Sequence, residues 1–156
     1  MLANSQCLRK SWVVAIGMDA HSRVVESIKL LRIMKYSGEE LAALIRMGAA
    51  MAAADGTVTK EEGFLGFVEL KNFCATPSDE TVIVARSQEM DFADAIGILS
   101  SMSDEKKKYA TGFLAATMAA DGEIDNSEVK LWQLICTLGG FPTMNIKEAL
   151  AYWTSH

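Results

Sequence analysis

The chain has 156 residues, of which 50% are hydrophobic and 22% charged, and it carries a formal net charge of −5. This length allows one domain with a sizeable core, while the acidic balance argues against a nucleic-acid binder, which needs clustered lysine and arginine. Three cysteines outside any CxxC pair argue against a structural zinc site or a disulfide framework, and two histidines leave little for imidazole-based catalysis.

The N-terminal stretch, residues 1–36, is expected to be a helical extension. From Ala20 to Met34 the apolar residues recur at steps of three and four, which is the spacing of an amphipathic helix. The apolar run Trp12–Ile16 is expected to be helical too, since nothing else in the chain would pair with a strand. No stretch approaches the roughly 20 apolar residues that a membrane span needs, and no clear signal-peptide cleavage site precedes Asp19. We therefore expect a cytoplasmic protein without a transmembrane segment.

Ser37 begins the first helix of the repeated part of the chain. Ser37 and Glu40 have the spacing of a capping box, in which each side chain accepts a hydrogen bond from an otherwise unpaired backbone amide. The helix is expected to run to about Ala54 and to end at Gly56, because glycine readily takes the left-handed backbone that closes a helix.

A second capping box, Thr59–Glu62, predicts a helix that continues to Phe73. Gly63 and Gly66 lie inside this helix, where each glycine costs about 1 kcal/mol relative to alanine. A closely packed neighbouring helix would offset that cost, so the two glycines mark an expected packing seam.

Two more helices are expected before the second repeat. Pro77 ends the preceding unit, and Ser78–Glu80 is expected to cap a helix that reaches about Gln88. Its β-branched residues could suggest a strand, but the acidic first turn favours a helix. A short helix is expected from Asp91 to Leu99.

The second repeat follows the same plan. Ser103 is expected to cap a helix that ends at Gly122, and Asp125 to cap the helix Asn126–Leu138. A last helix is expected over Ile146–Trp153. The side chains expected to be buried by the helix that Asp125 caps are Leu131, Trp132, Ile135 and Leu138.

One phrase occurs twice in the chain and indicates an internal duplication. The pattern Ala-Ala-Asp-Gly-x-(Val/Ile)-x-x-x-Glu covers Ala53–Glu62 and Ala119–Glu128, offset by 121 − 55 = 66 residues. Such a unit usually needs its partner to bury its apolar face. We therefore expect an all-α fold: a single-domain helical bundle over residues 1–156, with about seven to eight helices. It is built from two pseudo-symmetric helix-turn-helix repeats, about 37–90 and 103–156.

Each copy of the phrase is an acidic turn that has two interpretations. In the structural one, the glycine turns the chain and a capping box opens the next helix. It leaves Asp55 and Asp121 unexplained, because each lies near a helix C-terminus, where the macrodipole disfavours negative charge by roughly 0.3–1 kcal/mol. In the functional one, the turns are a weak metal or partner site. If a twofold arrangement brings the turns together, five carboxylates would share one site: Asp55, Glu62, Asp121, Asp125 and Glu128.

The phrase also matches the later part of an EF-hand loop, but it lacks the early ligands of that loop. Loop positions 1 and 3 would be Met51 and Ala53 in the first copy, and Thr117 and Ala119 in the second. Because calcium requires several oxygen ligands, a high-affinity EF-hand site is not expected. A weakly bound divalent cation, such as calcium or magnesium, is the cofactor that the carboxylates would suit.

The remaining motifs favour no class of enzyme. The sequence has no nucleophile elbow, no H-E-x-x-H motif and no phosphate-binding or dinucleotide-binding glycine loop. His21, close to Asp19, is expected to be a helix-start residue rather than a catalytic base. The run Lys106–Lys108 is expected to be a solvated helix face.

The two Asp-Gly turns resemble those of the TerB-like family of tellurite-resistance proteins. The matching residues are Met51–Gly56 with Val58 and Glu62, and Met118–Asp125 with Glu128. The resemblance implies an all-helical pseudo-twofold bundle, an acidic surface linked to divalent-cation binding and a role in the stress response, without an established catalytic activity. The first turn is less acidic than the second. The family also includes a domain of a membrane-linked co-chaperone, but the His-Pro-Asp motif of a J-domain does not occur in this sequence, so the resemblance implies no co-chaperone activity.

The leading hypothesis is a cytoplasmic, non-enzymatic interaction module. Its five carboxylates would form an acidic surface, with or without a bound cation, that recruits a protein partner; nucleic acid is not expected as a partner. Two alternatives stay open. One is a metal-dependent hydrolase of a small substrate, with the same carboxylates as ligands and a bound water as nucleophile. The other is a structural helical scaffold or homodimer whose turns bind nothing.

Overall fold

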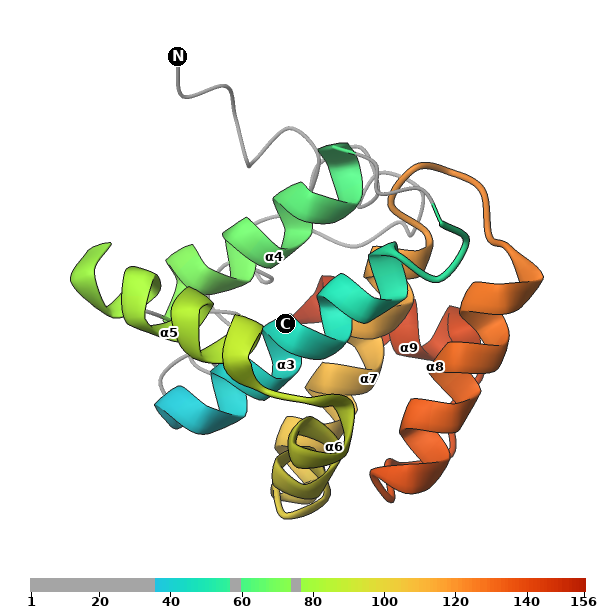
Figure 1. Ribbon diagram of the computed structural model, residues 1–156. Coiled ribbons are helices and arrows are strands. Elements are labelled where there is room, and N and C mark those ends of the chain that lie inside the picture. Colours follow the sequence, from blue (N-terminus) through green and yellow to red (C-terminus); the bar gives the residue numbers. More distant parts are fainter. Residues whose placement is uncertain (1–35, 57–59, 74–76) are drawn as a thin grey trace.

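The computed structural model describes residues 36–56, 60–73 and 77–156, and these form an all-α bundle (Figure 1). Seven helices and no strand occur in this part of the chain, which confirms the expected fold class. The helices are α3 (Gly38–Ala52), α4 (Lys60–Phe73), α5 (Pro77–Glu89), α6 (Phe92–Ser100), α7 (Asp104–Met118), α8 (Asn126–Leu138) and α9 (Ile146–Ser155). None of these helices has both the length and the apolar character that crossing a membrane would require.

The internal duplication is visible in how the helices begin and end. Helices α3 and α7 each have 15 residues, and each follows a serine N-cap, Ser37 or Ser103. The turns that follow them contain Gly56 at φ 87° and Gly122 at φ 90°, in the left-handed region that favours glycine. A serine cap therefore marks the start, and a turn glycine follows the end, of the equivalent helix in each repeat.

Helices α3 and α7 lie side by side at the centre of the bundle and run in the same general direction. Near their starts, Glu40 of α3 pairs with Lys106 of α7. Further along both helices, a Cβ at Gly48 would lie 3.0 Å from the Phe113 ring. Because both contacts advance together, the two helices end at the same side of the molecule, and both Asp-Gly turns leave from that side (Figure 1).

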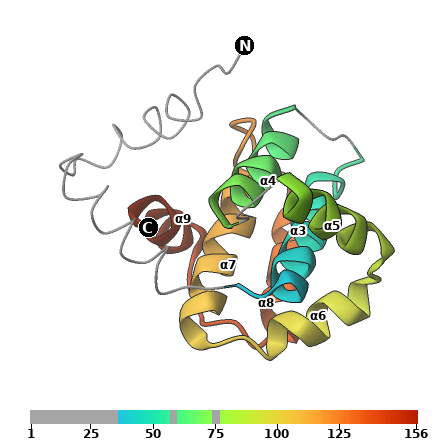
Figure 2. The same ribbon diagram turned by 90° about the vertical axis from the view of Figure 1, so that its left-hand side faces the viewer.

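The core surrounds α7. Every residue from Tyr109 to Met118 is buried, so the second half of this helix has no solvent-exposed face. A helix that is buried all round needs neighbours on every side, and α3, α4, α8 and α9 provide them. Figure 2 shows α9 on one side of α7 and α3 on the other. The largest fully buried side chains include Leu44, Met47, Met51, Phe113, Leu114 and Met118.

Helices α7 and α9 cross closely at Gly112. A Cβ at Gly112 would lie 2.6 Å from the carbonyl oxygen of Ala149 and 2.6 Å from the Cβ of Trp153, so α9 rests directly on the α7 backbone. The sequence suggested such a seam at Gly63 and Gly66 instead. Apart from its chain neighbours and the backbone of its own helix, no described atom lies within 4 Å of a Cβ at Gly63, and the Ile45 side chain is 4.0 Å from one at Gly66.

Several expectations about helix ends are confirmed, and two details are corrected. Helix α5 begins at Pro77 itself rather than behind a Ser78 cap, because proline suits the first turn, where its missing N–H has no partner to lose. Leu138 was expected to be buried but is 52% exposed, whereas Trp132 and Ile135 are buried as expected. Residues 1–35 of the expected N-terminal helical extension, which was to cover residues 1–36, and the expected Thr59 cap lie outside the described residues.

Candidate functional site

The second acidic turn holds Asp121 with a backbone amide of the turn itself. After α7 ends, Gly122 N–H donates to the Ala119 carbonyl at 3.2 Å, which turns the chain. Asp121 Oδ1 then accepts a hydrogen bond from Glu123 N–H at 3.0 Å. This Asx-type bond is a compensation for placing an acid near a helix C-terminus. The position of Asp121 therefore has a structural explanation, although its side chain remains exposed.

The start of α8 is a complete capping box between Asp125 and Glu128. Asp125 Oδ1 accepts from Ser127 N–H at 2.6 Å and also from the Ser127 hydroxyl. Glu128 Oε2 accepts from Asp125 N–H at 2.8 Å, and Glu128 is only 4% exposed. Hydrogen bonds from the Ser127 hydroxyl and amide lower the pKa of Asp125 below its usual value. Both carboxylates thus serve the helix start, as the structural interpretation of the turn predicted.

The first acidic turn is closed by a backbone hydrogen bond equivalent to the one in the second turn. Gly56 N–H donates to the Ala53 carbonyl at 3.0 Å, which matches the bond at Gly122 in the second turn. Asp55 is exposed. Residues 57–59 and the side chain of Glu62 lie outside the described residues, so the first capping box stays a prediction.

The structure brings the two turns to one end of the molecule, but the described carboxylates do not converge. Within the described residues, no group of three His, Cys, Asp or Glu side chains is placed to hold a metal ion. Asp121, Asp125 and Glu128 each accept a hydrogen bond from a backbone amide instead. The shared five-carboxylate site, which also needs Glu62, stays a prediction.

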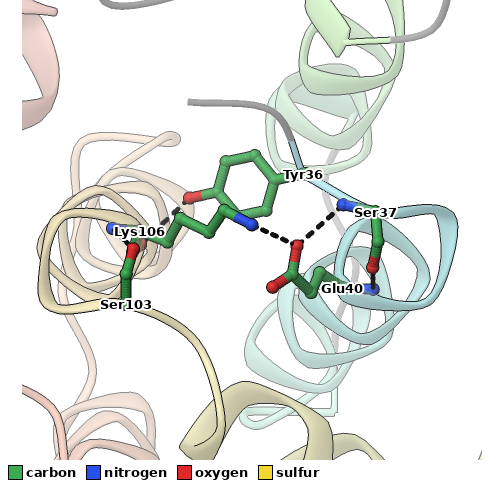
Figure 3. A network of polar contacts seen from close by, with 5 residues as sticks. All are labelled: Tyr36, Ser37, Glu40, Ser103 and Lys106. Carbon is green, nitrogen blue, oxygen red and sulfur yellow. Dashed lines mark hydrogen bonds and ion pairs between the residues drawn. The ribbon is translucent and has the colours of Figure 1, made fainter. Parts of the chain in front are cut away.

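A polar network joins the N-terminal ends of α3 and α7, away from the two turns, and the sequence did not predict it (Figure 3). Lys106 Nζ lies 2.6 Å from Glu40 Oε2, and it also lies 5.6 Å from the centre of the Tyr36 ring. The Tyr36 hydroxyl donates to the Lys106 carbonyl at 3.0 Å. The Glu40 side chain also accepts from Ser37 N–H at 2.7 Å, which completes the predicted capping box.

This network corrects the expectation for Lys106. The Lys106 and Glu40 side chains are only 20% and 18% exposed, so Lys106 does not belong to a solvated helix face. Burial raises the pKa of Glu40, but the hydrogen bonds from Lys106 and from the Ser37 amide outweigh burial and leave that pKa lowered. The sequence did contain a signal: the two residues occupy equivalent positions of the repeats and carry opposite charges.

Cys136 has no features of a reactive thiol. It is a partly buried free cysteine on α8, and burial raises the pKa of its thiol to about 12. Because the thiolate is the nucleophile and the metal ligand, a thiol with such a pKa stays protonated near neutral pH.

A solved structure resembles most of this chain. The crystal structure of a protein of unknown function from Porphyromonas gingivalis W83 matches with a TM-score of 0.67 and 35% sequence identity. The match covers 77% of this chain and 91% of that chain. No protein-family model matches the chain, and no curated protein matches it.

Proposed function

We propose that this chain, which belongs to the same family as the Porphyromonas gingivalis protein of unknown function, is a non-enzymatic interaction module. Its contact surface is the acidic end of the molecule, formed by the exposed residues Asp55, Asp121 and Glu123. Its partner is a protein with a basic surface.

The observation that carries this proposal is the common direction of α3 and α7. Because Glu40 meets Lys106 at one end of the pair, the two duplicated turns lie at the other end, and each exposes an aspartate there (Figure 1). An acidic surface on a chain of net charge −5 attracts a basic partner and speeds its association. The hydrogen bond from Glu123 N–H to Asp121 fixes part of this surface, which lowers the cost of ordering it on binding.

A divalent cation is an optional part of the proposal. A cation would need Asp55, Glu62, Asp121, Asp125 and Glu128 to converge. Three of these side chains, Asp121, Asp125 and Glu128, already accept hydrogen bonds from backbone amides. No described residue favours the hydrolase alternative. The cytoplasmic location and the stress-response setting are also proposals, which rest on the sequence and on the resemblance of the turns to the TerB-like family.

The experiment is a comparative capture of partners. The wild-type protein and Asp121→Asn with Glu123→Gln are immobilised, and crosslinked proteins from a lysate of the source organism are quantified by mass spectrometry. Asparagine keeps the acceptor oxygen of the turn, so the variant removes charge without removing the bond from Glu123 N–H. The matched control is Glu89→Gln with Asp94→Asn, which removes two exposed acids from α5 and α6.

We expect a basic protein that the wild type and the control capture and the turn variant does not. Its capture should weaken as the salt concentration rises, because exposed charges are screened. Identical sets of captured proteins for all three baits would contradict the proposal.

A further inference from the structure

Helix α8 carries a line of apolar side chains on its outer surface. Ile124, just before the helix, is 45% exposed, Leu134 is 48% exposed and Leu138 is 52% exposed. With the partly buried Leu131, these residues form what we call the α8 stripe. Residues 131, 134 and 138 are three and four positions apart, so they lie on one face of the helix.

The stripe is a concentration of exposed apolar residues rather than ordinary scatter. The described residues contain four exposed large hydrophobic side chains, and three of them belong to the stripe; the fourth, Val82, lies alone on α5. Single exposed apolar residues are normal on a protein surface, whereas contiguous apolar patches are typical of interaction sites.

The two exposed leucines of the stripe, Leu134 and Leu138, lie outside the face through which α8 packs inward. Trp132 and Ile135 of α8 are buried, and Trp132 Nε1 donates to the Thr111 carbonyl of α7 at 3.2 Å. Helix α8 lies at the edge of the bundle in Figure 1, where it contacts α7, α3 and α6 on its inner side. Leu131 packs against the edge of the core, whereas Leu134 and Leu138 stay exposed on the outer side of the helix.

The shape of the stripe suits a helix. It follows one helix over about 10 Å, from residue 131 to residue 138, at a rise of about 1.5 Å per residue. A second helix can lay its own apolar ridge along such a line. Addition of a strand would need a sheet edge, and the described residues contain no strand.

The two acids before α8 favour a basic end on the occupant, although the exposed Lys130 lies one helical turn before Leu134. Asp121 and Glu123 are exposed at the end where α8 begins, next to Ile124. Lysine or arginine at one end of an incoming helix would pair with these acids. A second copy of this chain would bring its own net charge of −5, and an anionic lipid surface would also be repelled.

We propose that the α8 stripe docks an amphipathic helix of a partner protein, with the basic end of that helix at Asp121 and Glu123. This inference rests on the proposed interaction function and adds to it the form of the partner segment.

The test uses a displayed library of helical peptides of about 18 residues with randomised surface positions, selected on the wild-type protein. We expect enriched peptides to carry apolar residues at helical spacing and lysine or arginine near one end. Affinities of fluorescently labelled selected peptides are then measured by anisotropy. Leu134→Gln with Leu138→Gln should weaken binding at least about tenfold, as loss of central apolar anchors does.

Three further variants make the test specific. Val82→Gln removes the exposed apolar residue outside the stripe and should leave the affinity unchanged. Asp121→Asn with Glu123→Gln should weaken binding several-fold and reduce its salt dependence. Leu134→Ala with Leu138→Ala repeats the main variant with smaller, helix-compatible side chains, and thermal melts verify that each variant is folded.

Several results would overturn the inference. The first is that the selection enriches no peptide, and the second is that the enriched peptides carry no basic residues. The third is that Val82→Gln weakens peptide binding as much as Leu134→Gln with Leu138→Gln does. Sedimentation velocity that shows a dimer abolished by Leu134→Gln with Leu138→Gln would assign the stripe to a second copy, and flotation with vesicles of neutral phospholipid would assign it to lipid. A cellular partner lost by the turn variant but kept by the leucine variant would leave the proposed function standing and reject the helix-docking inference alone.

Discussion

Glu40 and Lys106, which occupy equivalent positions in the two repeats, pair with each other across a sequence separation of 66 residues, with 2.6 Å between Oε2 and Nζ. Each is the third residue after a serine N-cap. In the first repeat the glutamate completes a capping box with Ser37. In the second, Ser103 Oγ accepts from Lys106 N–H at 3.5 Å, while the lysine side chain reaches across to α3. Two glutamates or two lysines at these positions would place like charges in contact, so a charge at one position requires the opposite charge at the other.

Exchange of the two charges should be tolerated better than either single change. Glu40→Lys alone and Lys106→Glu alone each place two like charges in a mostly buried site, and we expect each to lower the free energy of unfolding by about 2 kcal/mol or more. Glu40→Lys combined with Lys106→Glu restores the ion pair and moves the capping-box glutamate to Ser103. Urea unfolding of the four proteins gives the coupling energy as a double-mutant cycle.

The pseudo-symmetry of the site makes this cycle informative. A coupling of about 1–3 kcal/mol is expected for two charges in direct contact. If the double variant lost as much free energy of unfolding as the two single variants together, the two positions would not be equivalent in the repeats.

Because of Glu40, the free energy of unfolding should depend on pH in the acidic range. Its pKa in the folded protein is lowered from the ordinary value of 4.5, so the unfolded chain takes up a proton at higher pH than the folded chain. The stabilisation is therefore present above pH 4.5 and is lost as the pH falls through the folded pKa. Glu40→Gln should have a shallower loss of melting temperature over that acidic range than the wild type, and an equal slope for both would show that Glu40 is not responsible.

Gly112→Ala should destabilise the fold although alanine favours helices. The new Cβ would meet the backbone oxygen of Ala149 at 2.6 Å, and separating α7 from α9 should cost about 1–3 kcal/mol. Gly97→Ala on α6 is the matched control, because Gly97 is exposed and no described atom lies within 4 Å of its Cβ position. The control should gain up to about 1 kcal/mol. Thermal melts that show the same sign for both variants would contradict the close crossing at Gly112.

Asp125→Ala should cost about 1 kcal/mol, the usual effect of losing an N-cap. Asp125→Asn keeps an acceptor for the Ser127 amide and should be close to the wild type at neutral pH. The two should differ in acid, because the lowered pKa of Asp125 gives the wild type a stabilisation that disappears as the pH falls through that value. Chemical unfolding across the acidic range measures both effects, and an Asn variant with undiminished acid sensitivity would rule out this role of Asp125.

The sequence predicted those features that depend on neighbouring residues. The bounds of α8 are confirmed, because its N-cap Asp125 and the closing Gly139 lie beside the helix in the sequence. The exposure of Leu138 was missed because α8 has apolar residues on two faces, and the position of α7 decides which face is buried. The contacts of Glu40 with Lys106 and of Gly112 with α9 depend on packing between distant segments. For the candidate site, the Asp125–Glu128 capping box could likewise be predicted, whereas the placement of both turns at one end could not.

The structural interpretation of the turns predicts that divalent cations leave the melting temperature of the metal-stripped protein unchanged, whereas the five-carboxylate site predicts a rise. Asp121, Asp125 and Glu128 already accept hydrogen bonds from amides of their own turn and helix start, so the second turn is held without a cation. A ligand that binds only the folded state stabilises it by about 2.7 kcal/mol at a concentration of 100 times its Kd, which a melt would readily detect. Calcium, magnesium, manganese and zinc are added in turn to the wild type and to Asp55→Asn with Asp121→Asn. A rise selective for one cation and lost in this double variant would instead establish a metal site at the turns, and the acidic end would then recruit its partner in a cation-dependent way.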